Sequence, residues 1–430
     1  MISPEQFSDL REMVRQWQAK QPAPESIGEL EQCVMQATRV AGLAMMEEGI
    51  ERVDAGNRRR TKVAPCRCGA SARFMGYRPR EIITLYGVVD LERAYHYCRR
   101  CRTGLFLWDD AQGLNTLAWT PMVKALVSEL AGRLPYAEAA RVMGRFTGLG
   151  IEESCCERIV AEVGGRLRSE ESEQMAGYDC GQITPLVRRA PERLYVSMDG
   201  TSAHIDGSWH EVKTGVVHEA RPGPDGIDRA CGQRYVAAQE PAERFGERLY
   251  VGAAQAGVEQ ACEVVVAGDG AEWIWNVAAH HYPQATQILD CWHARQHIHA
   301  LASAYYGEGS AKGRRWADDH CRWLEQRGPG TLLRALKRMK PKSAQQAEAI
   351  RRERGYCERN AQRMQYPRYR AAGMMIGSGP VEAGCKTVVG GRLKGAGMRW
   401  SRAGADAVLA IRTALLSNQD NRILTASRAA

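Results

Sequence analysis

Two pairs of cysteines have the residue type and the spacing of a metal site. Cys66 and Cys68 form a Cys-x-Cys pair, and 29 residues separate them from the Cys98-x-x-Cys101 pair. Four thiolates match the tetrahedral coordination that Zn²⁺ prefers, and the alternating spacer can form a hairpin that brings the pairs together. The sequence therefore predicts a zinc-ribbon-like module with structural Zn²⁺. The alternatives are His96 as a substitute ligand and four buried thiols without a metal.

Three acidic residues from distant parts of the chain are candidates for a second, catalytic metal site. Asp199 lies in a predicted strand, Asp269 ends another, and Glu382 begins a predicted helix after the glycine-rich turn GSGP. Converging carboxylates repel one another unless cations neutralise them, and hard oxygen ligands favour Mg²⁺ or Mn²⁺. Two such ions can activate a water or a 3′-hydroxyl for phosphodiester displacement. The alternative for Glu382 is a first-turn carboxylate that interacts favourably with the helix dipole.

Asp290 and His293 form an Asp-x-x-His pair at the junction between a predicted strand and a predicted helix. We expect this pair to support the metal ligands, to contact DNA or to cap the helix. Asp290 also competes with Asp269 for the role of metal ligand. We favour Asp269 because it ends the fourth strand of the predicted core, and we favour carboxylates over His293 because hard ions prefer oxygen.

The segment around Glu382 is strongly basic and contains a tryptophan. We expect its cations to hold the backbone of DNA and its indole to stack on an exposed base. The residues proposed for this role are Lys386, Arg392, Lys394, Arg399 and Trp400.

Arginines also surround the four cysteines, which favours contact of the cysteine module with phosphates. They are Arg67, Arg73, Arg78, Arg80, Arg99, Arg100 and Arg102.

The charge of the chain is unevenly distributed. The formal charge is +9, and residues 301–375 contain 17 Lys and Arg but only 7 Asp and Glu. This segment is either a solvated basic helical face or a surface that binds a polyanion. No apolar run of about 18 residues predicts a membrane span, and the polar start MISPEQFSDLREMV lacks a signal-peptide pattern. We therefore expect a cytosolic protein whose 14 cysteines are thiols or metal ligands.

The order of predicted elements indicates what positions the three carboxylates. From Arg193 the pattern is three strands, a helix, a strand, a helix, a strand and a helix, which is typical of a ribonuclease H-like α/β core. Before it, the segment 134–167 predicts a helix, a glycine turn and a second helix starting near Glu152, as in a helix-turn-helix or a generic helical hairpin. Residues 171–191 are predicted to be a linker.

The sequence thus predicts an α/β protein with a ribonuclease H-like catalytic core and a helical insertion, preceded by a zinc-ribbon-like module and a helical DNA-binding region. The predicted boundaries are 1–62 for an N-terminal helical region, 63–110 for the zinc-ribbon-like module, 111–190 for the helical region and linker, 191–300 for the first part of the core, 301–372 for the basic helical insertion and 373–430 for the end of the core with the Glu-bearing helix.

Four motifs together resemble a known family. VSMDGT, GDGAEWIW, LDCWHARQHI and IGSGPVEAGCKTVVGGRLKGAGMRWS are similar to motifs of the bacterial ISKra-type insertion-sequence transposases, relatives of the Mutator-like DDE transposases. The resemblance covers residues 60–420, and the last motif is the most specific. It implies a catalytic triad of Asp199, Asp269 and Glu382, and a Cys-or-Asp-x-x-His signature that Asp290 and His293 fit. It also implies a helical insertion within the 112 residues that separate Asp269 from Glu382.

We therefore expect a DNA transposase that binds terminal inverted repeats, cuts DNA with two Mg²⁺ or Mn²⁺ ions, and joins the ends to target DNA. Because a transposase must bring two ends together, we expect a homodimer or a larger homo-oligomer, located at the bacterial nucleoid and not at a membrane. Two other function classes use part of the same residues. A ribonuclease H-like nuclease or resolvase would cleave without joining strands, and a domesticated, non-catalytic protein would use only the zinc module and the basic surfaces.

Overall fold

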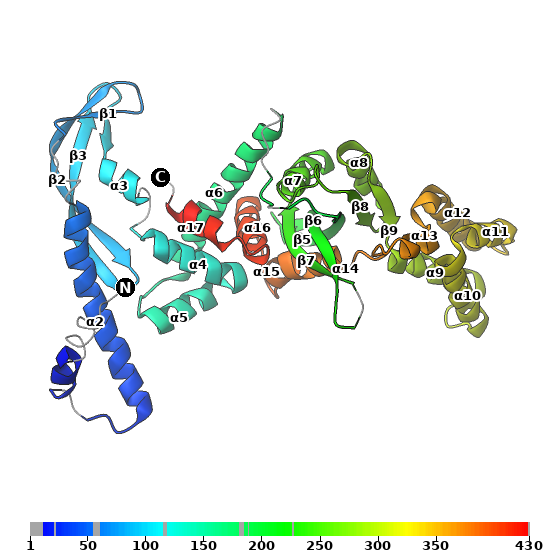
Figure 1. Ribbon diagram of the computed structural model, residues 1–430, viewed down its shortest axis with the longest axis horizontal. Coiled ribbons are helices and arrows are strands. Elements are labelled where there is room, and N and C mark those ends of the chain that lie inside the picture. The colour runs from blue at the N-terminus through cyan, green and yellow to red at the C-terminus, as the bar shows by residue number, and fades with distance from the viewer. Residues whose placement is uncertain are drawn as a thin grey trace. The chain divides into compact units, whose positions relative to one another are not determined.

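The protein is a mixed α/β chain that divides into two compact units. The N-terminal unit consists mainly of Met1–Val123 with Gly144–Leu149, and the C-terminal unit of Lys124–Met143 with Gly150–Ala429. Figure 1 labels their elements. The computed structural model describes residues 12–20, 23–54, 61–114, 118–179, 185–187, 189–225 and 228–428.

The N-terminal unit combines a long helix with a small antiparallel sheet, whose strand order is β1-β2-β3-β4. Apolar side chains from the second half of α2, including Leu43, Met46 and Ile50, pack against the β2–β3 hairpin. The hairpin forms from the alternating segment between the cysteine pairs, as the sequence predicts. The elements are α2 (Ile27–Asp54), β1 (Val63–Pro65), β2 (Ser71–Thr84), β3 (Gly87–Cys98), β4 (Thr103–Leu105) and α3 (Leu107–Gln112).

The C-terminal unit is built on a five-stranded sheet with the order β7-β6-β5-β8-β9. The pairs β5–β6 and β6–β7 are antiparallel, whereas β5–β8 and β8–β9 are parallel. All strands and helices from β5 onwards follow one another in the predicted order. The strands are β5 (Arg193–Ile205), β6 (Ser208–Pro222), β7 (Asp228–Ala238), β8 (Glu263–Gly268) and β9 (Thr286–Leu289).

Local sequence explains the geometry of this sheet. Asp206 and Gly207 both have positive φ, 47° and 81°, which is the backbone of a two-residue hairpin turn, and they join β5 to β6. β8 is a short apolar run because a parallel strand in the middle of a sheet is covered on both faces. Gly215 faces Leu249 of helix α7 (Ala242–Gln255), while its neighbour Thr214 lies on the opposite face.

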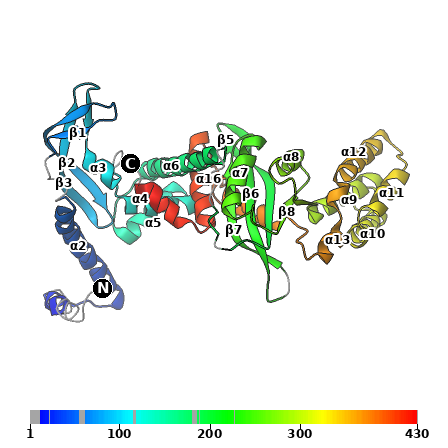
Figure 2. The ribbon, with the colours of Figure 1, turned by 45° about the horizontal axis from the view of Figure 1, so that its top comes forward.

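Helices cover the sheet and extend beyond its β9 edge, where α9–α13 gather (Figures 1 and 2). The helices that precede the sheet are α4 (Pro121–Arg133), α5 (Tyr136–Thr147) and α6 (Glu153–Asp179). Within and beyond the sheet the chain adds α8 (Glu272–His281), α9 (Cys291–Tyr306), α10 (Ala311–Arg327), α11 (Gly330–Arg338), α12 (Ala344–Asn360), the 3₁₀ helix η1 (Ala361–Arg363), α13 (Tyr366–Ala371), α14 (Gly379–Gly384), the π-helix η2 (Cys385–Gly390), α15 (Gly391–Leu393), α16 (Arg402–Leu416) and α17 (Asp420–Arg428).

Helix α6 starts one residue after the predicted position and ends at Asp179. Residues 171–179 are therefore helical, and the prediction of a linker from residue 171 was wrong. The polar sequence SEESEQ suggested a linker. Met175, which follows it, is buried, and this burial stabilises the continued helix. Among the described residues, no helix is both long and apolar enough to cross a membrane.

Helices α6 and α16 cross closely at Gly164. A Cβ atom on Gly164 would lie 2.4 Å from the Ala407 carbonyl oxygen, whereas a Cβ atom on the adjacent Gly165 meets no other atom within 4 Å. We therefore expect Gly164→Ala to lower the free energy of unfolding by about 1–3 kcal/mol, because backbone must move. Gly165→Ala should raise it by about 0.5–1 kcal/mol through helix propensity.

Urea denaturation of the two variants beside the wild type measures this difference. Equal effects of the two substitutions would contradict the close helix crossing, since the variants differ only in what the added methyl group meets.

Candidate active site and metal centre

The place where the parallel pairing of two neighbouring strands ends brings Asp199 and Asp269 together. The parallel pairing of β5 with β8 ends at Met198 and Gly268, and each aspartate is the next residue of its chain segment. Neighbouring strands lie about 4.8 Å apart, so the two aspartates start side by side. Short hydrogen bonds orient them: Gly200 N–H donates to Asp199 Oδ1 at 2.7 Å, and Ala271 N–H donates to Asp269 Oδ1 at 2.9 Å.

The pKa of Asp199 reports this environment. Burial is the largest cause that raises it, and the negative charge of Asp269 raises it further. Hydrogen bonds from Gly200 and from the Cys385 thiol, together with the charge of His293, act in the opposite direction. Ionisation of Asp199 is therefore unfavourable beside Asp269, and a nearby cation would relieve this repulsion.

Asp290 takes the equivalent place on the third parallel strand. The pairing of β8 with β9 ends at Gly268 and Leu289, so Asp290 starts beside Asp269. Its Oδ1 atom accepts the His293 N–H at 2.8 Å and caps α9, which is one of the roles expected from the sequence. Burial alone would raise the pKa of Asp290, but hydrogen bonds from His293 and Ser378 lower it to about 2.

The His293 ring lies among these carboxylates. Its Nδ1 atom is 3.5 Å from Asp290 Oδ1. The interaction with Asp290 is the largest cause that raises the pKa of His293, and the charges of Asp269 and Asp199 raise it further. A protonated His293 can therefore balance part of the negative charge of the site.

The loop that follows the helical insertion in the chain is hydrogen-bonded to Asp290. Ser378 donates to Asp290 Oδ2 with its backbone N–H and with its hydroxyl, the latter at 2.7 Å. Two residues earlier, the Ile376 carbonyl accepts the Cys291 N–H at 3.0 Å. The Ser378 carbonyl in turn accepts the Glu382 N–H at 3.1 Å. The start of helix α14, which carries Glu382, is thus tied to the strand end beside Asp269.

A second contact links this helical segment to Asp199. The Cys385 thiol interacts with the carboxylate of Asp199 and with the side chain of Thr214, the residue directly opposite Asp199 on β6. Glu382 precedes Cys385 by three residues on the continuous helical segment 379–393, and residues three apart are neighbours on a helix surface. Glu382 is exposed and lies one turn from the contact with Asp199.

The three predicted ligands do not form a closed, single-ion cluster. In the part of the chain that the structure describes, the four cysteines are the only His, Cys, Asp or Glu group of three or more whose ligand atoms all lie within 4.8 Å of one another. In a site for two ions about 4 Å apart, the ligand oxygens need not all lie this close together. Oxygens that bind opposite ions of the pair can be about 8 Å from each other.

The basic residues after Glu382 fall into two classes. Lys386, Lys394 and Arg399 are exposed, and Lys394 Nζ donates to Thr201 Oγ1 at 2.5 Å, two residues beyond Asp199. Arg392 and Trp400 are buried, so their predicted contacts with DNA were wrong.

Arg392 and Trp400 have interaction partners inside the C-terminal unit that the sequence did not predict. Arg392 Nε donates to the Ala131 carbonyl at 2.9 Å, and its guanidinium lies 4.7 Å from the ring centres of both Tyr136 and Trp400. Trp400 Nε1 donates to the Leu393 carbonyl at 3.2 Å. Cation–π contacts and buried hydrogen bonds of this kind stabilise the fold around the basic segment.

The four predicted zinc ligands do come together. The Sγ atoms of Cys66 and Cys101 are 3.5 Å apart, and those of Cys68 and Cys98 are 3.7 Å apart. Tetrahedral Zn–S bonds of 2.3 Å place sulfur atoms about 3.8 Å apart, so the cluster fits a Zn²⁺ ion.

The thiols also differ in acidity. Hydrogen bonds from Thr103 and Cys66 lower the pKa of Cys101 to about 6. His96 is buried elsewhere in this module, and its Nε2 atom lies 3.0 Å from the Thr61 carbonyl oxygen. It therefore does not take the place of a cysteine.

Six of the seven arginines around this cluster are exposed. The exception is Arg80, whose guanidinium lies 2.6 Å from the buried carboxylate of Asp109, beside Arg93. Arg80 therefore stabilises the module itself, and the expectation that it contacts phosphate was wrong.

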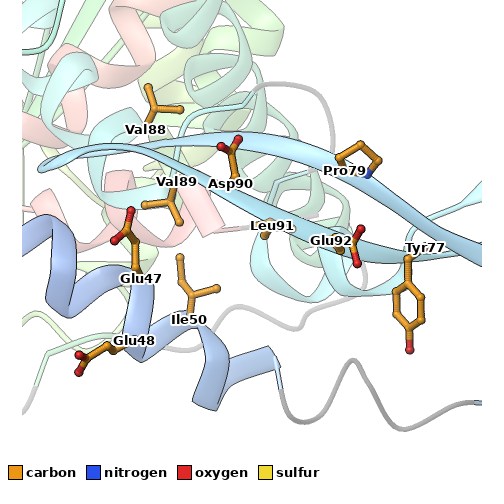
Figure 3. Close-up of a pocket in the computed structure, with 10 residues that line it drawn as sticks. All are labelled: Glu47, Glu48, Ile50, Tyr77, Pro79, Val88, Val89, Asp90, Leu91 and Glu92. Atoms are coloured by element: carbon orange, nitrogen blue, oxygen red, sulfur yellow. The ribbon is translucent and has the colours of Figure 1, made fainter.

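A hollow of about 870 Å³ lies between α2 and the β2–β3 hairpin, away from the cysteines (Figure 3). Its walls carry Glu47 and Glu48 from α2 together with Asp90 and Glu92 from β3. Four carboxylates repel phosphate, so the lining of this hollow does not favour a phosphate group.

Three residues that contact the carboxylate site were not predicted from the sequence. Ser378 and Cys385 hold the Glu-bearing segment, and Tyr356 of α12 donates to the Asp269 carbonyl at 2.8 Å. The signal for Cys385 was its position three residues after Glu382. Tyr356 gave no such signal, because it lies in the insertion, 87 residues from its partner.

Comparison with known proteins identifies a family that covers most of the chain. The uncharacterised protein family UPF0236 matches residues 24–426. No curated protein matches the chain.

We expect the purified protein to contain about one Zn²⁺ per chain, because four thiolates saturate a tetrahedral site. Cys98→Ser should abolish zinc binding and destabilise the N-terminal unit, whereas Cys33→Ser, an exposed cysteine of α2, should retain the metal. Elemental analysis by mass spectrometry measures the zinc content. Stoichiometric zinc in the Cys98 variant would contradict the site.

Asp290→Asn should lower the free energy of unfolding by about 2 kcal/mol at pH 7, because the folded protein holds the pKa of Asp290 near 2, below its ordinary value of 3.8. A lowered pKa stabilises the fold above the unfolded value, and the contribution is lost as the pH falls from about 4 towards 2. The gap between wild type and variant should therefore narrow on acidification.

Urea titrations followed by tryptophan fluorescence between pH 3 and pH 7 measure this gap. The exposed Asp318 of α10 provides the control, and Asp318→Asn should change stability little at any pH. A gap that stays constant with pH would refute the assignment.

Proposed function

The chain belongs to the uncharacterised protein family UPF0236, and we propose that it is the DNA transposase of an insertion sequence. In this proposal Asp199, Asp269 and Glu382 hold two Mg²⁺ or Mn²⁺ ions. The enzyme binds the terminal inverted repeats of its element, releases the 3′ ends by hydrolysis, and joins them to target DNA by transesterification. It acts at the nucleoid in the cytoplasm.

One observation supports the proposal: Asp199 and Asp269 each follow the last parallel-paired residue of neighbouring strands, and hydrogen bonds tie the segment that carries Glu382 to the adjacent Asp290. Asp290 and Ser378 anchor the start of that segment, and Cys385 anchors it to Asp199. The strand order β7-β6-β5-β8-β9, with three antiparallel strands followed by two parallel ones, supports a ribonuclease H-like core.

The donor set suits hard divalent cations. All three side chains are carboxylates, and the raised pKa of Asp199 reflects burial beside another negative charge. When bound, the ions would activate the attacking oxygen and stabilise the leaving oxygen. His293, whose pKa is raised, balances charge beside Asp269 and keeps Asp290 oriented.

Cationic side chains near the carboxylates would hold the DNA backbone. Lys394 reaches Thr201 beside Asp199, and Lys386 and Arg399 are exposed on the same basic segment. The insertion α10–α13 adds further exposed arginines, and Tyr356 connects it to Asp269. Synapsis of two DNA ends requires two active sites, so the working enzyme is a homodimer or a larger homo-oligomer.

A strand-transfer assay tests the proposal. Pre-cleaved ends from the DNA that flanks the gene are incubated with a target plasmid and Mg²⁺, and joined products are counted. Asp199→Asn, Asp269→Asn and Glu382→Gln should each reduce joining roughly a thousand-fold, since loss of a ligand removes several kcal/mol of transition-state stabilisation. The matched control is Glu243→Gln, an exposed acid of α7, which should retain activity.

The other outcomes identify other functions. Metal-dependent cleavage without joined products would indicate a nuclease or resolvase. DNA binding without any metal-dependent chemistry would indicate a non-catalytic DNA-binding protein. Full activity of the Glu382 variant would exclude this triad.

A further inference from the structure

The helical insertion contains a groove whose walls differ in chemistry. Its volume is about 400 Å³, within the range of about 300–1,000 Å³ that is usual for small-molecule sites. Aromatic side chains come from α9 and α10, and cationic side chains come from α11. The aromatic and cationic residues that line the groove include Tyr305, Tyr306, Trp316, Trp323, Arg334 and Arg338.

Tyr305, Tyr306 and Trp316 of the aromatic wall pack against the apolar core, but Trp323 does not. Helix α10 already buries Ala317, Cys321 and Leu324. Trp316 and Trp323 lie on a second stripe of the same helix and are only half-buried. The indole of Trp323 is absent from the apolar core that Trp316 joins, so burial does not explain its presence.

Ring contacts hold this wall in a fixed geometry. His320 stacks on Trp316 with ring centres 4.0 Å apart and meets Trp323 edge-on at 5.0 Å. Its Nδ1 atom donates to the Trp316 carbonyl at 2.7 Å, which fixes the imidazole between the two indoles. On α9, the Tyr305 hydroxyl donates to the Lys340 carbonyl at 2.9 Å and joins α9 to the residues after α11.

The opposite wall carries two exposed guanidinium groups. Arg334 and Arg338 are four residues apart on α11 and line the groove together. In the described part of the chain neither forms an ion pair with a carboxylate, and Arg334 donates only to the Thr331 hydroxyl, at 3.1 Å. Two cations with unused donors beside aromatic faces match a flat base attached to a phosphate.

We propose that this groove binds one unpaired nucleotide of DNA, with its base against the aromatic wall and its phosphate on Arg334 and Arg338. A paired base cannot enter, because its faces are covered by its neighbours in the duplex. The groove therefore recognises single-stranded ends or a base turned out of the helix. This inference rests on the proposed action on DNA, and it concerns residues outside the carboxylate site.

Binding of the full-length protein to a 12-nucleotide single strand and to a 12-base-pair duplex tests the inference by fluorescence anisotropy. Trp323→Ala and the double variant Arg334→Gln/Arg338→Gln should each weaken single-strand binding roughly ten-fold, with duplex binding changed less than about two-fold. The control is Arg244→Gln, an exposed arginine of α7, which should bind both DNAs as the wild type does. The double variant changes only exposed side chains, so it retains the fold.

A single 2-aminopurine in the strand gives a second readout, because stacking on an aromatic ring quenches its fluorescence. Quenching by the wild type and its loss in Trp323→Ala support the groove. Unchanged single-strand affinity in both variants, or equal weakening for single strand and duplex, overturns it. Strand transfer by the wild type is scored separately, so a failure of the proposed transposase activity is distinguishable from a failure of the groove.

Discussion

The buried carboxylate of Asp290 is the constraint on which the arrangement of the site depends. A buried charge must be satisfied by hydrogen bonds, and Asp290 takes them from His293 at the start of α9 and from Ser378 before α14. These contacts join the end of β9 to both ends of a helical excursion of more than 80 residues. They determine where the chain returns to the sheet, and so where Glu382 stands relative to Asp199 and Asp269.

The arrangement of the parallel strands also determines where negative charge collects. Asp199, Asp269 and Asp290 each follow the last parallel-paired residue of β5, β8 and β9, so strand pairing alone concentrates negative charge at one place along the sheet. His293 offsets part of it, and hydrogen bonds keep Asp290 ionised. The pKa of Asp199 is raised, mainly by burial and further by the charge of Asp269, so a cation beside it would stabilise its ionised form.

The sequence predicted what depends on local pattern. Alternation and apolar runs predicted the five strands from Arg193 onwards, and cysteine spacing predicted a cluster that the structure contains. The sequence-based predictions were wrong where contacts between distant segments determine whether a residue is buried. Arg392 and Trp400 looked like surface residues because the segment around them is rich in glycine and basic residues, but Tyr136, more than 250 residues earlier, gives them an interior partner. Ser378 and Tyr356 act through contacts across the insertion, and single-sequence patterns carry no information about such contacts.

The close crossing of α6 and α16 has a consequence for biosynthesis. The C-terminal unit cannot complete its core until residues 402–416 have left the ribosome, because Arg412 bonds the Gly132 carbonyl 280 positions upstream. Non-local contacts of this length slow folding, since distant segments must first meet. Glu382 also emerges late, after the helical insertion. A partly synthesised chain therefore lacks both the completed core of this unit and Glu382.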